Sequence, residues 1–128
     1  MKTITLVFGA VYGLLSVILG AFGAHALKKI LSVEKLESFE TGIRYQMYAA
    51  FFLIIVGYIL KFDTSSQKWI SILMIAGTML FSFSIYGLSL QDYLGVNLKF
   101  LGPITPLGGL FMILSCGMLI FYFSKNKI

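Results

Sequence analysis

The residues of this sequence that could perform chemistry are few, and four of them belong to neighbouring segments. His25 ends a long apolar stretch, and Glu40, Arg44 and Gln46 begin the next one on the same side of a membrane. Glu40 and Arg44 are four positions apart, so on a helix they share a face and can pair, and a histidine titrates near neutral pH. We expect these four residues to form a polar cluster. The cluster is either a proton-linked or ligand-binding site or a structural clasp.

A second motif of interest contains two prolines and three glycines at the start of a late apolar stretch. Pro103 suits the first position of a helix, where its missing N–H is tolerated. A helix N-terminus can receive an anion or a lipid headgroup, and the alternative is a helix start followed by a tight packing face. The candidate residues of this helix-start motif are Gly102, Pro103, Thr105, Pro106, Gly108 and Gly109.

Other kinds of site are not indicated by the sequence. The one histidine has no nucleophile in a recognisable hydrolase motif, and no phosphate-binding loop or dinucleotide fingerprint is present. One cysteine, Cys116, and one histidine do not make a metal site. The basic residues are spread along the chain and do not form a nucleic-acid-binding face. We therefore predict no enzyme activity, catalytic residue, cofactor, metal or nucleic-acid partner.

The elements that must position these residues are membrane-spanning helices. Of the 128 residues 59% are hydrophobic and only 12% are charged, with a mean hydropathy of +0.93. Four stretches approach the twenty or so apolar residues that a span needs, and backbone groups in lipid must bond within their own helix. The predicted spans of this single domain, residues 1–128, are about 4–27, 45–60, 69–90 and 103–123. The first is longer than the apolar part of a signal peptide, so we expect it to be retained.

The connection between the first two spans has an amphipathic pattern of its own. Val33, Leu36, Phe39 and Ile43 recur every three or four residues, and Ser32 is a plausible N-cap. We predict a helix that lies on the membrane surface and bends at Gly42 into the second span. Alternatives are an extension of that span beyond the bilayer or a solvated hairpin helix. The predicted fold is thus all-α, an integral membrane four-helix bundle with an amphipathic interfacial helix between helices 1 and 2.

The first span carries a stripe of small residues at alternating spacings of four and three. In lipid, close packing of helices depends on such residues, and this spacing is typical of a left-handed helix pair. We expect the stripe to be a packing face that buries the first span among the others. The members of this packing stripe are Gly9, Gly13, Ser16, Gly20 and Gly23.

Three segments together resemble a known family. They are residues 20–27 (GAFGAHAL), 41–46 (TGIRYQ) and 102–109 (GPITPLGG). In order and spacing they are similar to the YgdD/YwdK-like family, a domain-of-unknown-function family of small, uncharacterised four-span membrane proteins. The resemblance implies a bacterial inner membrane or its equivalent, and it implies no activity. Ala49 stands where that family often has a second histidine, which argues against a two-histidine relay.

The function expected from these observations is that of a non-enzymatic structural or accessory membrane component. Its partners would be membrane lipids, and other membrane proteins or a second copy of itself. The alternatives are a subunit of a small-solute or proton transporter or channel and, more weakly, a membrane enzyme acting on lipid. Both termini are expected in the cytoplasm, although the basic residues divide evenly. The terminal side has Lys2, Lys61, Lys68, Lys125 and Lys127, and the other has Lys28, Lys29, Lys35, Arg44 and Lys99.

Overall fold

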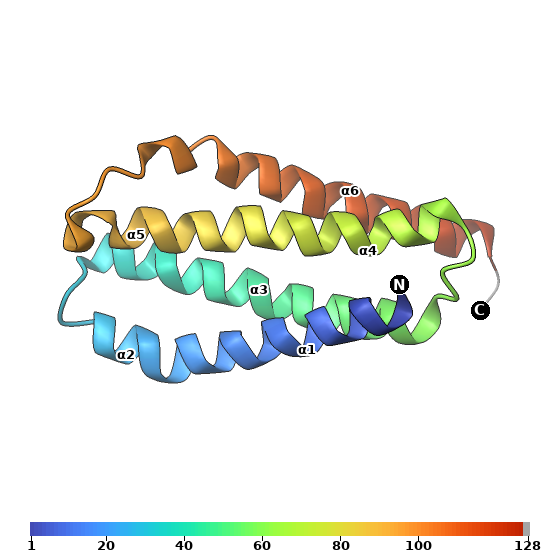
Figure 1. Cartoon of the computed structure of the whole chain (residues 1–128), viewed down its shortest axis with the longest axis horizontal. Helices are drawn as coiled ribbons and strands as arrows, with labels where there is room; N and C mark the ends of the chain where they lie inside the picture. Colours follow the sequence, from blue (N-terminus) through green and yellow to red (C-terminus); the bar gives the residue numbers. More distant parts are fainter. Residues whose placement is uncertain (127–128) are drawn as a thin grey trace.

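Four helical rods run side by side along the long axis of the molecule (Figure 1). The computed structural model describes residues 1–126, and Lys127, one of the basic residues counted above, lies outside them. The first rod is α1 (Lys2–Ile18), a π-helical turn η1 (Leu19–Gly23) and α2 (Ala24–Leu27), and the second is α3 (Val33–Ile59). The third is α4 (Ser65–Thr78), a π-helical turn η2 (Met79–Phe83) and α5 (Ser84–Leu94), and the last is a 3-10 turn η3 (Lys99–Leu101) before α6 (Ile104–Lys125).

The rods confirm the prediction of an all-helical fold with four helices that are long and apolar enough to cross a membrane. Each has 26 to 30 residues. At 1.5 Å per residue the rods are about 40 Å long, which exceeds the ~30 Å hydrocarbon core of a bilayer. The ends of the rods therefore extend into the headgroup regions, where charged side chains are tolerated.

The prediction of a separate interfacial helix is wrong, because residues 33–44 are the first turns of α3. The helix continues through Gly42, which is buried so closely that an added Cβ would lie 2.7 Å from Cε1 of Tyr86. Phe39 is also buried, with its ring centroid 4.9 Å from that of Tyr86. Phe39 and Gly42 thus pack on α5, whereas Val33 of the same apolar face remains exposed. A helix face that packs on another helix and one that lies on lipid have the same amphipathic spacing, so the sequence could not distinguish these two environments.

Local capping explains where the helices begin and end. The Ser32 side chain accepts a hydrogen bond from the backbone N–H of Lys35 (3.3 Å), which confirms the predicted N-cap, and Thr64 caps α4 in the same way. Gly95 ends α5 in the left-handed conformation, with φ of 69°. Residues 28–32 and 95–103 lie at one end of the molecule, here named the connection end, and the N-terminus, the end of α6 and residues 60–64 lie at the other, the terminal end (Figure 1).

Small residues determine which helices touch. Along α1, the space beside Gly9 is closed by α3, because an added Cβ would lie 2.8 Å from Ile54 Cγ1 and 3.1 Å from the Ala50 carbonyl oxygen. Gly13 and Gly20 also face α3, at ordinary contact distances, whereas Gly23 meets only its own Leu19. Ser16, the remaining stripe residue, is buried.

The backbones of α6 and the third rod also approach each other closely. An added Cβ on Gly77 would lie 2.8 Å from the Gly108 carbonyl oxygen, and one on Gly108 would lie 2.7 Å from the Gly77 carbonyl oxygen. The two backbones therefore cross in direct contact. By contrast, the backbones of α3 and α6 do not approach each other closely in the described chain.

Candidate functional site

Within residues 1–126, no hydrogen bond or ion pair joins the four residues of the predicted polar cluster to one another. His25 is exposed on α2, and Arg44 is exposed on α3, where it donates a hydrogen bond to the Thr41 hydroxyl (3.0 Å). Glu40 is half-buried, and the ion pair found within residues 1–126 involves Lys35 and not this carboxylate. Within residues 1–126, the predicted cluster is therefore not held together by ion pairs.

Gln46, the fourth residue, belongs to a different network inside the bundle. Its side chain is fully buried, its Nε2 donates to the Tyr12 carbonyl oxygen (3.0 Å), and its Oε1 accepts from the Tyr86 hydroxyl (2.7 Å). The Tyr12 hydroxyl in turn donates to the Ile75 carbonyl oxygen (2.7 Å). This network joins α3 to α1 and α5, and α1 to α4. It places a fixed, internally satisfied amide in the centre of the membrane domain.

Other hydroxyl groups connect the rods in the same manner. Ser82 donates to the Gly42 carbonyl oxygen (2.8 Å), and Ser115 donates to the Ile70 carbonyl oxygen (2.5 Å). The Thr5 hydroxyl is hydrogen-bonded to that of Ser71 (2.5 Å). Hydrogen bonds between helices stabilise a bundle in lipid, where water is absent. Sequence reasoning missed all three pairs, because nothing local identifies the group on another rod that each hydroxyl will meet.

The helix-start motif lies at the beginning of α6, as predicted, with Pro103 as the residue before the first turn. The Thr105 hydroxyl is hydrogen-bonded to that of Ser84 (2.5 Å), and Gly108 makes the backbone crossing described above. Gly109 faces the Phe81 ring at an ordinary contact distance. Thr105, Gly108 and Gly109 of the motif therefore pack against the third rod. Gly102 and Pro106 also line a cavity.

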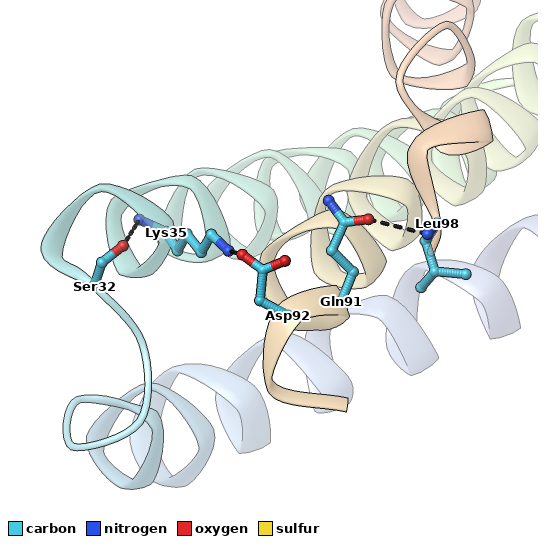
Figure 2. A network of polar contacts seen from close by, with 5 residues as sticks. All are labelled: Ser32, Lys35, Gln91, Asp92 and Leu98. Carbon is cyan, nitrogen blue, oxygen red and sulfur yellow. Dashed lines mark hydrogen bonds and ion pairs between the residues drawn. The ribbon is translucent and has the colours of Figure 1, made fainter. Parts of the chain in front are cut away.

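An ion pair at the connection end was not predicted (Figure 2). Lys35, in the first turn of α3, reaches across to Asp92 near the end of α5. Beside it, the side-chain oxygen of Gln91 accepts a hydrogen bond from the backbone N–H of Leu98 (3.0 Å), which holds the following loop. Lys35 and Asp92 are far apart in the sequence, so only the folded helices bring them together.

Two cavities lie between α3 and α6. One, of about 340 Å³ at the connection end, is lined by Lys35 and Ser38 of α3, by Ser89 of α5 and by Thr105 and Pro106 of α6, among others. The Ser89 hydroxyl is buried and has no hydrogen-bond partner within the described residues. The other, of about 680 Å³, is almost wholly apolar. Its lining includes Tyr45, Tyr48, Phe81, Gly109, Cys116 and Gly117.

No group of three or more histidine, cysteine, aspartate or glutamate residues within residues 1–126 is placed to hold a metal ion. Cys116, the free cysteine, is exposed on α6. The two cavities between α3 and α6 instead offer basic, hydroxyl and aromatic side chains for recognition.

Comparison with known proteins finds one family and several named relatives. Residues 19–109 match the family described as "Protein of unknown function (DUF423)". The chain is 38% identical to the UPF0382 membrane protein YwdK of Bacillus subtilis (strain 168), over 90% of this chain and 91% of that protein. It is 35% identical to the UPF0382 inner membrane protein YgdD of Escherichia coli (strain K12), over 81% and 76%. It is 39% identical to a UPF0382 membrane protein of Schizosaccharomyces pombe, over 81% and 87%. No solved structure matches.

Proposed function

This chain belongs to the DUF423 family of membrane proteins of unknown function, and we propose from its structure that it is a non-enzymatic component of the cell membrane. In this proposal it acts through contacts that its outer surface makes with lipids and with other membrane proteins. The surface is well suited to that role, because the outermost helices present many large apolar side chains. Examples are Leu14 of α1 and Ile113 of α6, which are 60% and 68% exposed.

The observation that carries the proposal is the chemistry of the interior. The buried polar side chains of the described chain belong to serine, threonine and glutamine residues, none of which ionises near neutral pH. Most of them are hydrogen-bonded to a partner inside the protein, and many of these bonds join two different rods. Groups that are already satisfied in this way stabilise the bundle and are not free to pass a proton or to activate a substrate.

The transporter alternative has less support. A pathway for a polar solute needs polar groups lining a cavity across the hydrocarbon core, and the cavity at that depth is almost wholly apolar. His25 and Arg44, which that alternative would use, line neither of the two cavities described above.

Flux measurements on purified protein in vesicles test the proposal. We expect proton and small-solute leak equal to that of protein-free vesicles of the same lipid composition, with no difference between the natural chain and Gln46→Leu. A flux that the natural chain supports and Gln46→Leu abolishes would overturn the proposal, since it would show that the internal amide lies on a pathway.

We also propose that both termini face the cytoplasm. The basic residues divide evenly between the two ends, so the count of lysine and arginine residues does not decide the orientation and labelling has to. In a Cys116→Ser background, a cysteine at Ser66 should resist an impermeant thiol reagent in intact cells, and one at Ser38 should react. Both serines are exposed, so the reverse labelling pattern would place the termini outside.

A further inference from the structure

The two cavities between α3 and α6 lie along one line. On α3, Lys35 and Ser38 of the first cavity and Tyr45 and Phe52 of the second recur at spacings of three or seven residues. Such spacings place side chains on one face of a helix. The same holds on α6, where the lining residues of the first cavity are followed after one turn by those of the second. The two cavities therefore lie in line between α3 and α6, with residues of the third rod in both linings, and together they are here named the α3/α6 groove.

The two parts of the α3/α6 groove differ in chemistry. At the connection end, Lys35 and the hydroxyls of Ser38, Ser89 and Thr105 belong to the lining. Further along, aromatic and aliphatic side chains and the exposed Gly117 form the lining. A groove that is polar and basic at headgroup depth and apolar within the hydrocarbon core matches an amphiphile that enters from the bilayer.

We propose that the α3/α6 groove binds one membrane phospholipid with an anionic headgroup. The phosphate lies at the connection end, near Lys35 and the start of α6, and one acyl chain lies along the apolar part. The inference rests on the proposed function, because it identifies a lipid class as a partner of this membrane component.

Three observations favour a phosphate at the connection end. The Lys35 ammonium group has three N–H donors. Asp92 is bound on one side of it, so donors remain for a second anion. The backbone N–H groups of Ile104 and Thr105, at the start of α6, have no partner within that helix and carry partial positive charge. Ser89 is buried with an unpartnered hydroxyl and lines the same cavity. A buried hydroxyl without a partner is unfavourable, and a phosphate oxygen would satisfy it.

The length of the apolar part favours an acyl chain over a transmembrane helix of another protein. From Gly109 to Ile120 the lining extends about 16 Å along α6 at 1.5 Å per residue. That is close to half of the ~30 Å hydrocarbon core, which is the depth of one leaflet. A spanning helix would need a groove about twice as long. The volume of about 680 Å³ lies within the usual range for a small-molecule site.

Native mass spectrometry of the full chain in mild detergent, with equal amounts of phosphatidylglycerol and phosphatidylethanolamine of the same acyl chains, tests the headgroup end. We expect one retained lipid, with phosphatidylglycerol preferred. Lys35→Gln should reduce that preference about tenfold, the factor that one hydrogen bond to a charged group supplies. Lys28→Gln, an exposed lysine at the same end, is the matched control and should leave the preference unchanged.

Two further pairs of variants keep the test independent of folding. Ser89→Ala removes no hydrogen bond of the structure and should still weaken lipid retention several-fold, whereas Ser16→Ala, which removes the other buried unpartnered hydroxyl, should not. Gly117→Phe places a ring in open space of the groove and should reduce retention of both lipids. Leu110→Phe, on the outer face of α6, is its control.

The inference is overturned if Ser89→Ala and Gly117→Phe retain lipid as the natural chain does. It is also overturned if soluble glycerol 3-phosphate displaces the lipid at millimolar concentration, because the site would then be one for free phosphate esters. The vesicle flux experiment proposed above is a readout separate from lipid retention. If the protein supports flux and also retains lipid, only the proposed function is contradicted. If it supports no flux and retains no lipid, only the lipid site is contradicted.

Discussion

The crossing of α6 over the third rod at Gly77 and Gly108 leads to a sharp prediction for a single methyl group. In Gly108→Ala the new Cβ would lie 2.7 Å from the Gly77 carbonyl oxygen and closer still to the Phe81 nitrogen. Both neighbours are backbone atoms, so no side chain can rotate away to make room. The helices must separate, and this stretches the hydrogen bonds of Thr105 and Ser115 on either side of the crossing.

The size of the effect follows from two opposing terms. Inserting a methyl group into a packed interface costs about 1–3 kcal/mol, and backbone neighbours place this site near the upper limit. Replacing glycine by alanine within a helix gains about 0.5–1 kcal/mol. The difference is a net destabilisation of about 2 kcal/mol for Gly108→Ala.

Gly117 of the same helix supplies the control, because an added Cβ there would have nothing within 4 Å. Gly117→Ala should therefore show only the propensity gain, of about 0.5–1 kcal/mol. The free energy of unfolding can be measured for both variants by titrating the protein in mixed detergent micelles. If Gly108→Ala is as stable as the natural chain, or more stable than Gly117→Ala, the close crossing does not exist in solution.

Three further predictions concern single polar contacts. Gln46→Leu should destabilise the bundle by about 1 kcal/mol, since its two interhelical hydrogen bonds are worth about 0.6 kcal/mol each. Adding Tyr86→Phe to that variant should cost little more, because Gln46 and Tyr86 share one hydrogen bond. In a double-mutant cycle, Lys35→Gln and Asp92→Asn should couple by about 0.5 kcal/mol, falling with added salt; additivity at low salt would refute the pair. Ser32→Ala should cost about 1 kcal/mol of helix stability and speed amide exchange in the first turn of α3, and unchanged exchange would contradict the cap.

The overall fold could be predicted from the sequence because the bilayer simplifies the problem. Long apolar stretches in lipid must be helices, and four of them were visible by length and composition alone. The cap at Ser32 was also predictable, because it depends on residues within one turn. The course of residues 33–44 was not, since Phe39 and Ile43 would present the same spacing to a membrane surface or to neighbouring helices.

The candidate site was harder to predict because it depends on pairs of residues from different rods. The sequence suggested Glu40 and Arg44 as partners from their spacing alone, yet Arg44 turns to Thr41 and the ion pair forms between Lys35 and Asp92. Spacing identifies which residues can meet within one helix. It does not show which of them will find a better partner on a neighbouring helix.

The position of the α3/α6 groove follows from the same distribution of small and large side chains. Gly9 allows α1 to approach α3, and the Gly77–Gly108 crossing brings α6 against the third rod, so these glycines determine the closest neighbour of each outer helix. The side of α3 that faces the groove instead carries large residues, among them Tyr45, Tyr48 and Phe52, and the backbones of α3 and α6 make no close contact within residues 1–126. A soluble protein would close such an apolar gap to exclude water. In a membrane there is no such drive, because acyl chains can fill the space, and the groove stays open to the molecules that surround it.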